Sequence, residues 1–503
     1  MRKKVISLMM CLAFIICLVG CGEKPTETNN SSVEEVSSVE AQGGFDMDDD
    51  GATASGGIYK NIVTDKGADL KQYNDNKVYK GRATDLKGKT ILVQSWGTGS
   101  TALNGTGLLP KRANALISSI EKTLNCQIKV LTGFSGYDTE STSGLAAGKP
   151  TADIIYLSKK DLISNYSYNR LVDLSSLNVM DFKDRSCFSE ATELAKFNGK
   201  YYAVAPRCYG SIAFSVASCI YANVDVLTKC GVTVNDLTKW VDSKAWTWDK
   251  MKEVAAKVKS QGYTFMYDGT TAKDNEREHS LYSSLLASVG IDWVAQNSKG
   301  KFSFAGDSQK AKTVLDFYKS MYDKGYVVQT ESAIEKFSSS DSAMLSAAMY
   351  TAKFNDRSSS YGNYVLLPLP LEKKNSNYTY ATGDYSFAAI ARGTKPSGLS
   401  DAEIATVLNL INSCLVSEKE NESLVVQESI GWAKNALSQK TVKIYNDITA
   451  KNKFAVAWSG MILTNENMWI PDVFKFANGD LSKQQILAQS KSLNTKLEKF
   501  LDR

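Results

Sequence analysis

Short β-rich runs alternate with longer segments of helical periodicity from residue 87 onward, and this alternation limits the fold more than any other feature. Lys89–Trp96 and Asp153–Leu157 have the composition and length of strands, whereas Trp248–Lys259 carries apolar residues at helical spacing. Further strands are expected at Gln127–Leu131, Tyr201–Pro206, Ile212–Tyr221 and Tyr263–Tyr267, and further helices at Leu109–Leu124, Leu281–Val289, Ser308–Lys324, Ser400–Val416 and Lys483–Leu501. The alternation predicts an α/β protein, and about 400 to 450 residues are enough for two lobes.

The N-terminus has the layout of an export signal. Cationic residues at positions 2–4 precede an apolar run, Val5–Val19, which is too short to be a convincing membrane-spanning helix. The run ends in Leu18-Val19-Gly20-Cys21, which resembles the bacterial lipobox. The resemblance implies a signal peptide at 1–20, a lipid on Cys21, and a protein held at the extracytoplasmic face of the cell membrane. The alternative is a plain secretory signal in which Cys21 is incidental.

Residues 21–57 are expected to form a disordered acidic tether, and residues 58–87 an extension whose order the sequence leaves open. Between residues 22 and 50 there are nine acids against one Lys and almost no large apolar side chains, so there is too little to bury to offset the entropy of folding. Asp46, Asp48, Asp50 and Gly51 imitate the start of a calcium loop, but Gly57 stands where a bidentate Glu is needed. This stretch is therefore interpreted as a spacer.

Composition argues against several functional classes. The whole chain carries a formal charge of +5, and no run of Lys and Arg is interleaved with aromatic residues, which disfavours nucleic acid as a partner. His279 is the sole histidine and there is no C-x-x-C pair, so neither a zinc site nor a Ser–His or Cys–His catalytic pair is indicated. Disulfides are permitted outside the cell, but small buried apolar residues are the favoured interpretation of most of Cys126, Cys187, Cys208, Cys219, Cys230 and Cys414.

A weak dinucleotide-binding motif follows the first expected strand. Residues Gly97–Ala102 fit G-x-G-x-x-A. A nucleotide site needs a helix to begin at those glycines, whereas here a helix more plausibly begins near Pro110. The glycines are interpreted as a turn at a cleft edge, and no cofactor is expected.

A series of segments in the right order resembles the extracellular solute-binding proteins of bacterial ABC importers, in particular the sugar-binding family 1. The matching segments are Leu145–Pro150 with Ala152–Ile155, Gly199–Pro206, Ile220–Leu227, Thr247–Met251, Tyr364–Pro370 and Gly479–Ser482. The resemblance covers nearly all of the chain from about residue 87. Two departures, an extra residue at Val204-Ala205 and Ala222 in place of a family Tyr, affect the fine alignment.

The resemblance implies a two-lobed, type II periplasmic-binding-protein-like α/β fold with a central ligand cleft and a hinge. Lobe 1 is expected to contain residues 88–206 and 369–415, and lobe 2 residues 207–368 and 416–503. The chain would cross between lobes near Pro206, near Leu367–Pro370 and near Cys414–Ser417. Ligand that touches both lobes would stabilise a closed form, which the membrane subunits of an ABC permease recognise. The expected state is a monomer.

A carbohydrate is the leading ligand. Sugar rings pack their C–H faces on aromatic planes, and their hydroxyls need fixed polar partners. Aromatic and polar residues near expected strand ends or loops are the candidate contacts, and Trp469 is added because relatives of this fold supply a stacking residue from a late segment. The candidates are Trp96, Arg207, Tyr209, Tyr267, Asp268, Tyr350, Asp384, Tyr385 and Trp469.

Three alternatives stay open. A peptide importer would also use an extended cleft with aromatic walls, and a sensor-coupled receptor would share the fold. A secreted glycosidase would need two carboxylates about 5–9 Å apart, and the sequence identifies no such pair. Binding rather than catalysis is therefore expected.

Overall fold

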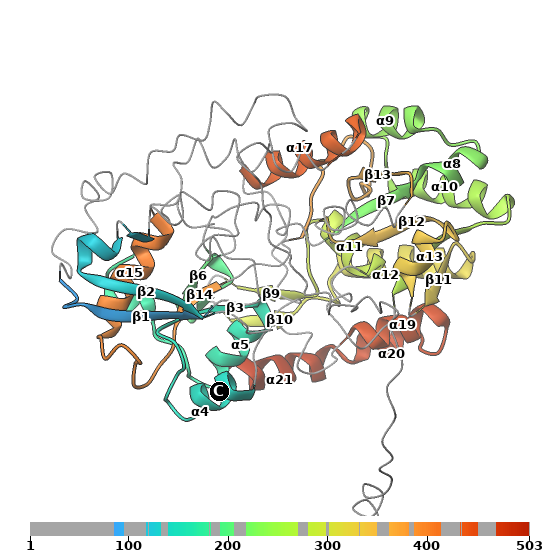
Figure 1. Ribbon diagram of the computed structural model, residues 1–503. Coiled ribbons are helices and arrows are strands. Elements are labelled where there is room, and N and C mark those ends of the chain that lie inside the picture. Colours follow the sequence, from blue (N-terminus) through green and yellow to red (C-terminus); the bar gives the residue numbers. More distant parts are fainter. Residues whose placement is uncertain are drawn as a thin grey trace, which may run out of the picture. The chain divides into compact units, whose positions relative to one another are not determined.

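The computed structural model describes residues 85–94, 117–118, 120–131, 139–180, 182, 192–205, 218–269, 280–297, 301–330, 332–349, 362–381, 387–413, 433, 435–450 and 469–501 (Figure 1). The signal peptide, Cys21, the tether and the extension expected at 58–87 lie outside this range, apart from the last residues of the extension. Within these segments, no helix combines the length and apolar character that crossing a bilayer requires.

The first of two five-stranded sheets has the order β2-β1-β3-β14-β6. Its strands are β1 (Lys89–Gln94), β2 (Cys126–Leu131), β3 (Ile154–Leu157), β6 (Ala203–Val204) and β14 (Phe387–Ile390). Strand β1 runs parallel to β2 and β3, and β14 runs antiparallel to β3 and β6. The last strand to enter this sheet, β14, therefore lies between β3 and β6.

Both faces of the first sheet are covered, which explains why β3 is apolar at every position. Ile154 and Tyr156 pack on the same cluster as helix α15 (Asp401–Ser413), whereas Ile155 and Leu157 point to the opposite face and join the cluster of α5 (Lys159–Ser167). Successive residues of a strand point to opposite faces, so a doubly covered strand needs an unbroken apolar run. Helix α4 (Thr139–Ala146) and the short 3-10 turn η4 (Leu174–Leu177) complete this part.

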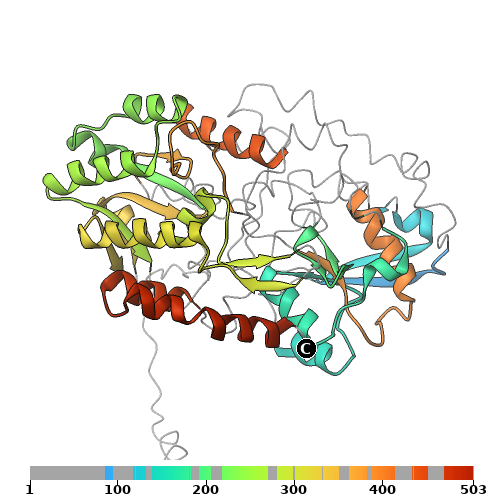
Figure 2. The same ribbon diagram turned by 180° about the vertical axis from the view of Figure 1, so that it is seen from behind.

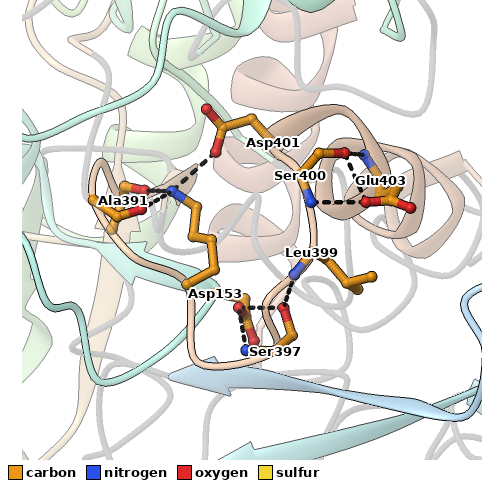
Figure 3. A network of polar contacts seen from close by, with 9 residues as sticks. Asp153, Ala391, Ser397, Leu399, Ser400, Asp401 and Glu403 are labelled. Carbon is orange, nitrogen blue, oxygen red and sulfur yellow. Dashed lines mark hydrogen bonds and ion pairs between the residues drawn. The ribbon is translucent and has the colours of Figure 1, made fainter.

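Asp153, in a segment that resembles the family, ties three parts of the first sheet together (Figure 3). Its buried carboxylate accepts hydrogen bonds from Leu92 N at 2.8 Å, from Ser397 N at 3.2 Å and from Ser397 Oγ at 2.7 Å. The same loop holds the buried Lys395, whose ammonium bonds the Ala391 carbonyl and lies 2.9 Å from Asp401. Strand β1 and the loop from β14 to α15 are thus fixed by the residue that precedes β3.

The second sheet has the order β11-β8-β12-β7-β13. Its strands are β7 (Cys219–Asn223), β8 (Thr264–Gly269), β11 (Val327–Thr330), β12 (Ser342–Ala347) and β13 (Tyr364–Leu367). Strand β8 is parallel to β11 and β12, and β7 is antiparallel to β12 and β13. Of the strand expected at Ile212–Tyr221, only the part from Ser218 onward is described, and β7 begins at Cys219.

Ten helices accompany the second sheet in the described residues, and residues that cap several of them belong to segments that resemble the family. They are α8 (Val224–Lys229), α9 (Val234–Asp242), α10 (Trp248–Ser260), α11 (Leu281–Ser288), α12 (Gln309–Asp323), α13 (Ala333–Ser338), α17 (Ala436–Ala450), α19 (Ile470–Asn478), α20 (Lys483–Ala488) and α21 (Ser490–Leu501). Thr247 accepts a hydrogen bond from Lys250 N and so caps α10. Gly479 ends α19 at φ 91°, and Ser482 opens α20 with a capping box.

Two small hairpins stand outside the sheets. The first pairs β4 (Lys196–Phe197) with β5 (Lys200–Tyr201) through Asn198-Gly199, whose φ values of 50° and 79° suit the tight turn. The second pairs β9 (Val294–Gln296) with β10 (Phe302–Phe304).

The crossing expected near Leu367–Pro370 lies further along the chain. After β13, the segment 368–381 remains bonded to elements of the second sheet: Trp246 Nε1 donates to the Pro368 carbonyl at 2.9 Å, and Thr379 Oγ1 donates to the Ala287 carbonyl at 2.6 Å. The chain joins the first sheet at Phe387. The family resemblance implied a crossing here, but Leu369 N donates to Tyr445 OH and Leu371 N to the Trp246 carbonyl, which keeps this segment on the second sheet's side.

Candidate functional site

One edge of the first sheet carries the strand ends that adjoin several candidate residues in the sequence. Strand β14 is antiparallel to both β3 and β6, so β1, β3 and β6 run in one direction. Their carboxyl ends and the start of β14 therefore share an edge, which we call the first carboxyl edge. In the sequence, Trp96 follows the end of β1, Arg207 and Tyr209 follow β6, and Asp384 and Tyr385 precede β14. These five candidates lie outside the described residues.

The second sheet has a matching edge. Strands β8, β11, β12 and β13 run in one direction and β7 in the other, so the ends of four strands and the start of β7 lie together at the second carboxyl edge. Tyr267 and Asp268 are near the end of β8, and Tyr350, outside the described residues, follows β12 in the sequence. Along the chain, β6 of the first sheet is followed by β7 of the second, and β13 of the second sheet is followed by β14 of the first.

Asp268 does not occupy the rim position that the sequence suggested. It is 2% exposed, and its carboxylate accepts hydrogen bonds from Leu281 N at 3.0 Å, Tyr318 OH at 2.7 Å and Tyr322 OH at 3.0 Å. Burial raises the pKa of this carboxyl above its usual range, although the three donors oppose the shift. Asp268 holds the first turn of α11 and two tyrosines of α12.

The buried position gives Asp268 a measurable pH signature. Because its folded pKa is raised, its contribution to the free energy of unfolding is fully present below the unfolded pKa of about 3.9 and is lost as pH rises through the folded value. We therefore expect the stability of the wild type relative to Asp268→Asn to fall in urea titrations as pH rises above the unfolded pKa.

Asp236→Asn is the matched control for this measurement. Bonds from Thr233 lower the pKa of Asp236, so its contribution is present at neutral pH and is lost as pH falls. The two differences should change with pH in opposite directions. Parallel changes would show that the burial of Asp268 does not control its ionisation.

Tyr267 keeps a partly exposed ring beside Asp268. Thr264 Oγ1 donates a hydrogen bond to the Tyr267 hydroxyl at 3.3 Å, and the Lys336 ammonium lies 5.9 Å from the centroid of the Tyr267 ring. As neighbours in β8, Tyr267 and Asp268 point to opposite faces of the sheet. Of the candidates that the structure describes, Tyr267 alone retains accessible surface, and its ligand contact stays a prediction.

Trp469 is a packing residue in this structure. Its side chain is 1% exposed, its Nε1 donates to Tyr282 OH at 3.2 Å, and its ring meets Phe304 edge-on at 4.6 Å. A Cβ at Gly306 would lie 3.1 Å from the indole, so this residue must be small. Trp469 precedes α19 at φ 71° and ψ −58°, a rare conformation for a side chain of this size. The indole thus stabilises the junction of α11, α19 and β10.

Three serines at the second carboxyl edge escaped the sequence analysis. Ser284 Oγ lies 2.9 Å from Ser218 Oγ and 2.6 Å from Ser346 Oγ, which joins α11, the approach to β7 and the end of β12. Ser346 is half-buried, whereas Ser218 and Ser284 are buried. A serine within the apolar run of β12 was the available signal, since such a hydroxyl needs a partner.

The described residues supply no metal or thiol chemistry. Across these segments, no group of three or more His, Cys, Asp or Glu side chains could hold a metal ion. Cys126, Cys219 and Cys230 are buried free thiols, and burial raises the pKa of Cys126 to about 11. These three act as small apolar residues, as expected, and the other cysteines lie outside the described range.

Comparisons with known proteins agree with this arrangement. The sequence profile of a family described as "Bacterial extracellular solute-binding protein" matches residues 115–449. No curated protein matches the sequence closely enough to be informative.

Solved structures are similar over most of the chain. A cyclic alpha-maltosyl-1,6-maltose binding protein from Arthrobacter globiformis has 13% identity and a TM-score of 0.59, over 82% of this chain and 100% of its own. A galacto-N-biose-/lacto-N-biose I-binding protein from Bifidobacterium longum has 14% identity and a TM-score of 0.54, over 82% and 98%. A substrate-binding protein from Listeria monocytogenes, in complex with cycloalternan, has 14% identity and a TM-score of 0.50, over 83% and 100%. These likenesses show the two-lobed α/β fold of periplasmic binding proteins.

Proposed function

The chain belongs to the bacterial extracellular solute-binding protein family, and from this premise we propose that it captures an oligosaccharide between its lobes for delivery to an ABC permease. The observation that carries the proposal is the topology of the two carboxyl edges. Six of the nine ligand candidates adjoin, in the sequence, a strand end at one of these edges, and Tyr267 lies in β8 near its end. The chain passes from the first sheet to the second between β6 and β7 and returns between β13 and β14. Hinge bending in these connections changes the distance and the angle between the two edges.

The chemistry next to these edges supports a sugar. Aromatic side chains suit the C–H faces of sugar rings. Four of the candidates next to these strand ends in the sequence are aromatic: Trp96, Tyr209, Tyr350 and Tyr385. The half-buried Ser346 adds a hydroxyl that belongs to a hydrogen-bonded serine set. The named ligands of the similar solved structures, a maltosyl-maltose, lacto-N-biose and cycloalternan, are all saccharides.

The lobe boundaries follow from the sheets. We assign residues 88–205 and 387–413 to lobe 1, and residues 218–381 and 435–501 to lobe 2. The second boundary moves from residue 369 to between Ala381 and Phe387, because residues 368–381 are bonded to lobe 2. Ligand that touches both lobes stabilises the closed arrangement only through its differential affinity for that arrangement.

We propose further that Cys21 carries a lipid and that residues 21–57 tether a monomeric body to the outer face of the cell membrane. The family supports an extracytoplasmic position, and the lipobox-like sequence supports the anchor. Fractionation of cells that express Cys21→Ala tests this proposal. Release of the variant from the membrane fraction is the expected result, and full retention would contradict the anchor.

A thermal-shift screen of the mature chain tests the function. The panel contains linear and cyclic α-glucans, lacto-N-biose, chitin oligosaccharides and short peptides. A ligand that binds only the folded state increases the free energy of unfolding by mass action, by about 2.7 kcal/mol at 100 times Kd, and so raises Tm. We expect a saturable shift with one glycan class. A saturable shift with peptides alone would contradict the proposal, as would the absence of a shift with every compound in the panel.

A further inference from the structure

The β9–β10 hairpin is rooted in lobe 2. Ala305 N donates to the Trp293 carbonyl at 2.7 Å and closes its base, and the Phe304 ring packs on Trp469. Helix α21 lies along the hairpin (Figure 2): Phe304 N donates to Asn494 Oδ1 at 2.7 Å, and Lys301 forms a 3.1 Å ion pair with Glu498. These bonds fix the orientation of the hairpin.

The other side of the hairpin contacts lobe 1. The Phe302 ring centroid lies 6.4 Å from that of Phe197 in β4, and Gln296 Nε2 donates to the Lys196 carbonyl at 3.3 Å. Phe197 is in turn stacked on Tyr166 of α5 at 4.1 Å. Phe302 and Phe197 are both buried, so this is a packed contact rather than a grazing surface one.

The contact lies away from the first carboxyl edge. In β6, Val204 pairs with Ala388 and Ala203 with Ala389, so the chain before Ala203 extends past the opposite edge of the sheet. The β4–β5 hairpin belongs to this preceding stretch. Phe197 and Lys196 therefore stand at the edge opposite to the one that carries the ligand candidates and the connections to lobe 2.

We propose that the β9–β10 hairpin is a non-covalent strut between the lobes that opposes their closure. Strand β6 ends and β14 begins at the first carboxyl edge, whereas the strut meets lobe 1 on the opposite side. Rotation that brings the carboxyl edges together must then separate Phe302 from Phe197 or deform the hairpin. An aromatic pair of this kind corresponds to about a two- to tenfold change in an equilibrium between two lobe arrangements.

Phe302→Leu and Phe304→Leu form a matched pair for the test. Both residues lie on the same face of β10, but Phe302 meets lobe 1 and Phe304 meets Trp469 within lobe 2. Spin labels on unnatural amino acids at the exposed positions Lys129 and Lys257 report the distance between lobes without a ligand. This design leaves the strut testable even if the carbohydrate proposal fails.

We expect Phe302→Leu to shift the distance distribution toward shorter values, with the shorter population increased about two- to tenfold. Phe304→Leu should lower the unfolding midpoint while leaving the distribution as in the wild type. Gln296→Ala, which removes one hydrogen bond at a partly exposed site, should give a smaller shift in the same direction. An unchanged distribution in both Phe302→Leu and Gln296→Ala, or the same change in Phe304→Leu, would overturn the strut.

Discussion

Replacing Asp153 with alanine is expected to lower the free energy of unfolding by about 3–5 kcal/mol, the largest effect of any single substitution considered for this chain. The carboxylate is 0% exposed and accepts hydrogen bonds from Leu92 N, Ser397 N and Ser397 Oγ. Alanine leaves these three donors without their acceptor, and a buried unsatisfied donor costs about 1–3 kcal/mol before the surroundings relax. Urea titration followed by circular dichroism measures the loss.

Asp236→Ala provides the scale for this measurement. Asp236 also accepts bonds from a backbone N–H and a hydroxyl, but within an exposed capping box of α9. Loss of such a cap costs about 0.5–2 kcal/mol. Equal losses for the two variants would show that burial adds nothing at Asp153, and the Asp153 network would then not be the tie that holds β1, β3 and the β14–α15 loop.

The largest expected effect on function comes from Trp96→Ala. If Trp96 stacks on a sugar ring beside the first carboxyl edge, alanine removes the plane that the ring packs against, and we expect a ten- to roughly hundredfold weaker Kd for the glycan that shifts the wild-type Tm. Isothermal titration measures Kd directly. The melting temperature without ligand should change little.

Trp240→Ala is the matched control for Trp96→Ala. Trp240 lies on α9 with the Lys250 ammonium 5.1 Å from its ring, and it is not one of the ligand candidates. This variant should bind the glycan like the wild type. Wild-type affinity in Trp96→Ala would remove Trp96 from the site, and equal weakening in both variants would indicate a general loss of folding.

The elements of regular structure were largely predictable from the sequence. The helix expected at Ser308–Lys324 is Gln309–Asp323, with Ser308 as its cap, and the helix expected at Trp248–Lys259 is Trp248–Ser260. These limits depend on local chemistry, namely a capping hydroxyl and a periodic apolar face. The family assignment depended on the order of such segments along the sequence, and the match of the family profile confirmed it.

Positions that depend on distant residues were not predictable. Asp268 was expected to be an accessible residue near a strand end. It is buried because Tyr318 and Tyr322, some fifty residues later in the chain, donate hydrogen bonds to its carboxylate. Trp469 is buried because Phe304 and Tyr282 converge on it. The serine set at the second carboxyl edge likewise joins Ser218, Ser284 and Ser346 from three elements. Apart from the apolar run around Ser346, no local pattern distinguishes these residues from exposed ones.

The place of β14 in the first sheet has a consequence for the order of folding. Within the described residues, β6 pairs only with β14. The backbone of Ala203 therefore has no strand partner in the sheet until Ala389 is in place. A chain that leaves its site of synthesis N-terminus first must release residues 218–381, with all five strands of the second sheet, before the first sheet can close. Contacts between residues so far apart form slowly because the intervening loop must first be closed. Closure of the first sheet is therefore a late event, which follows the synthesis of every strand of the second sheet.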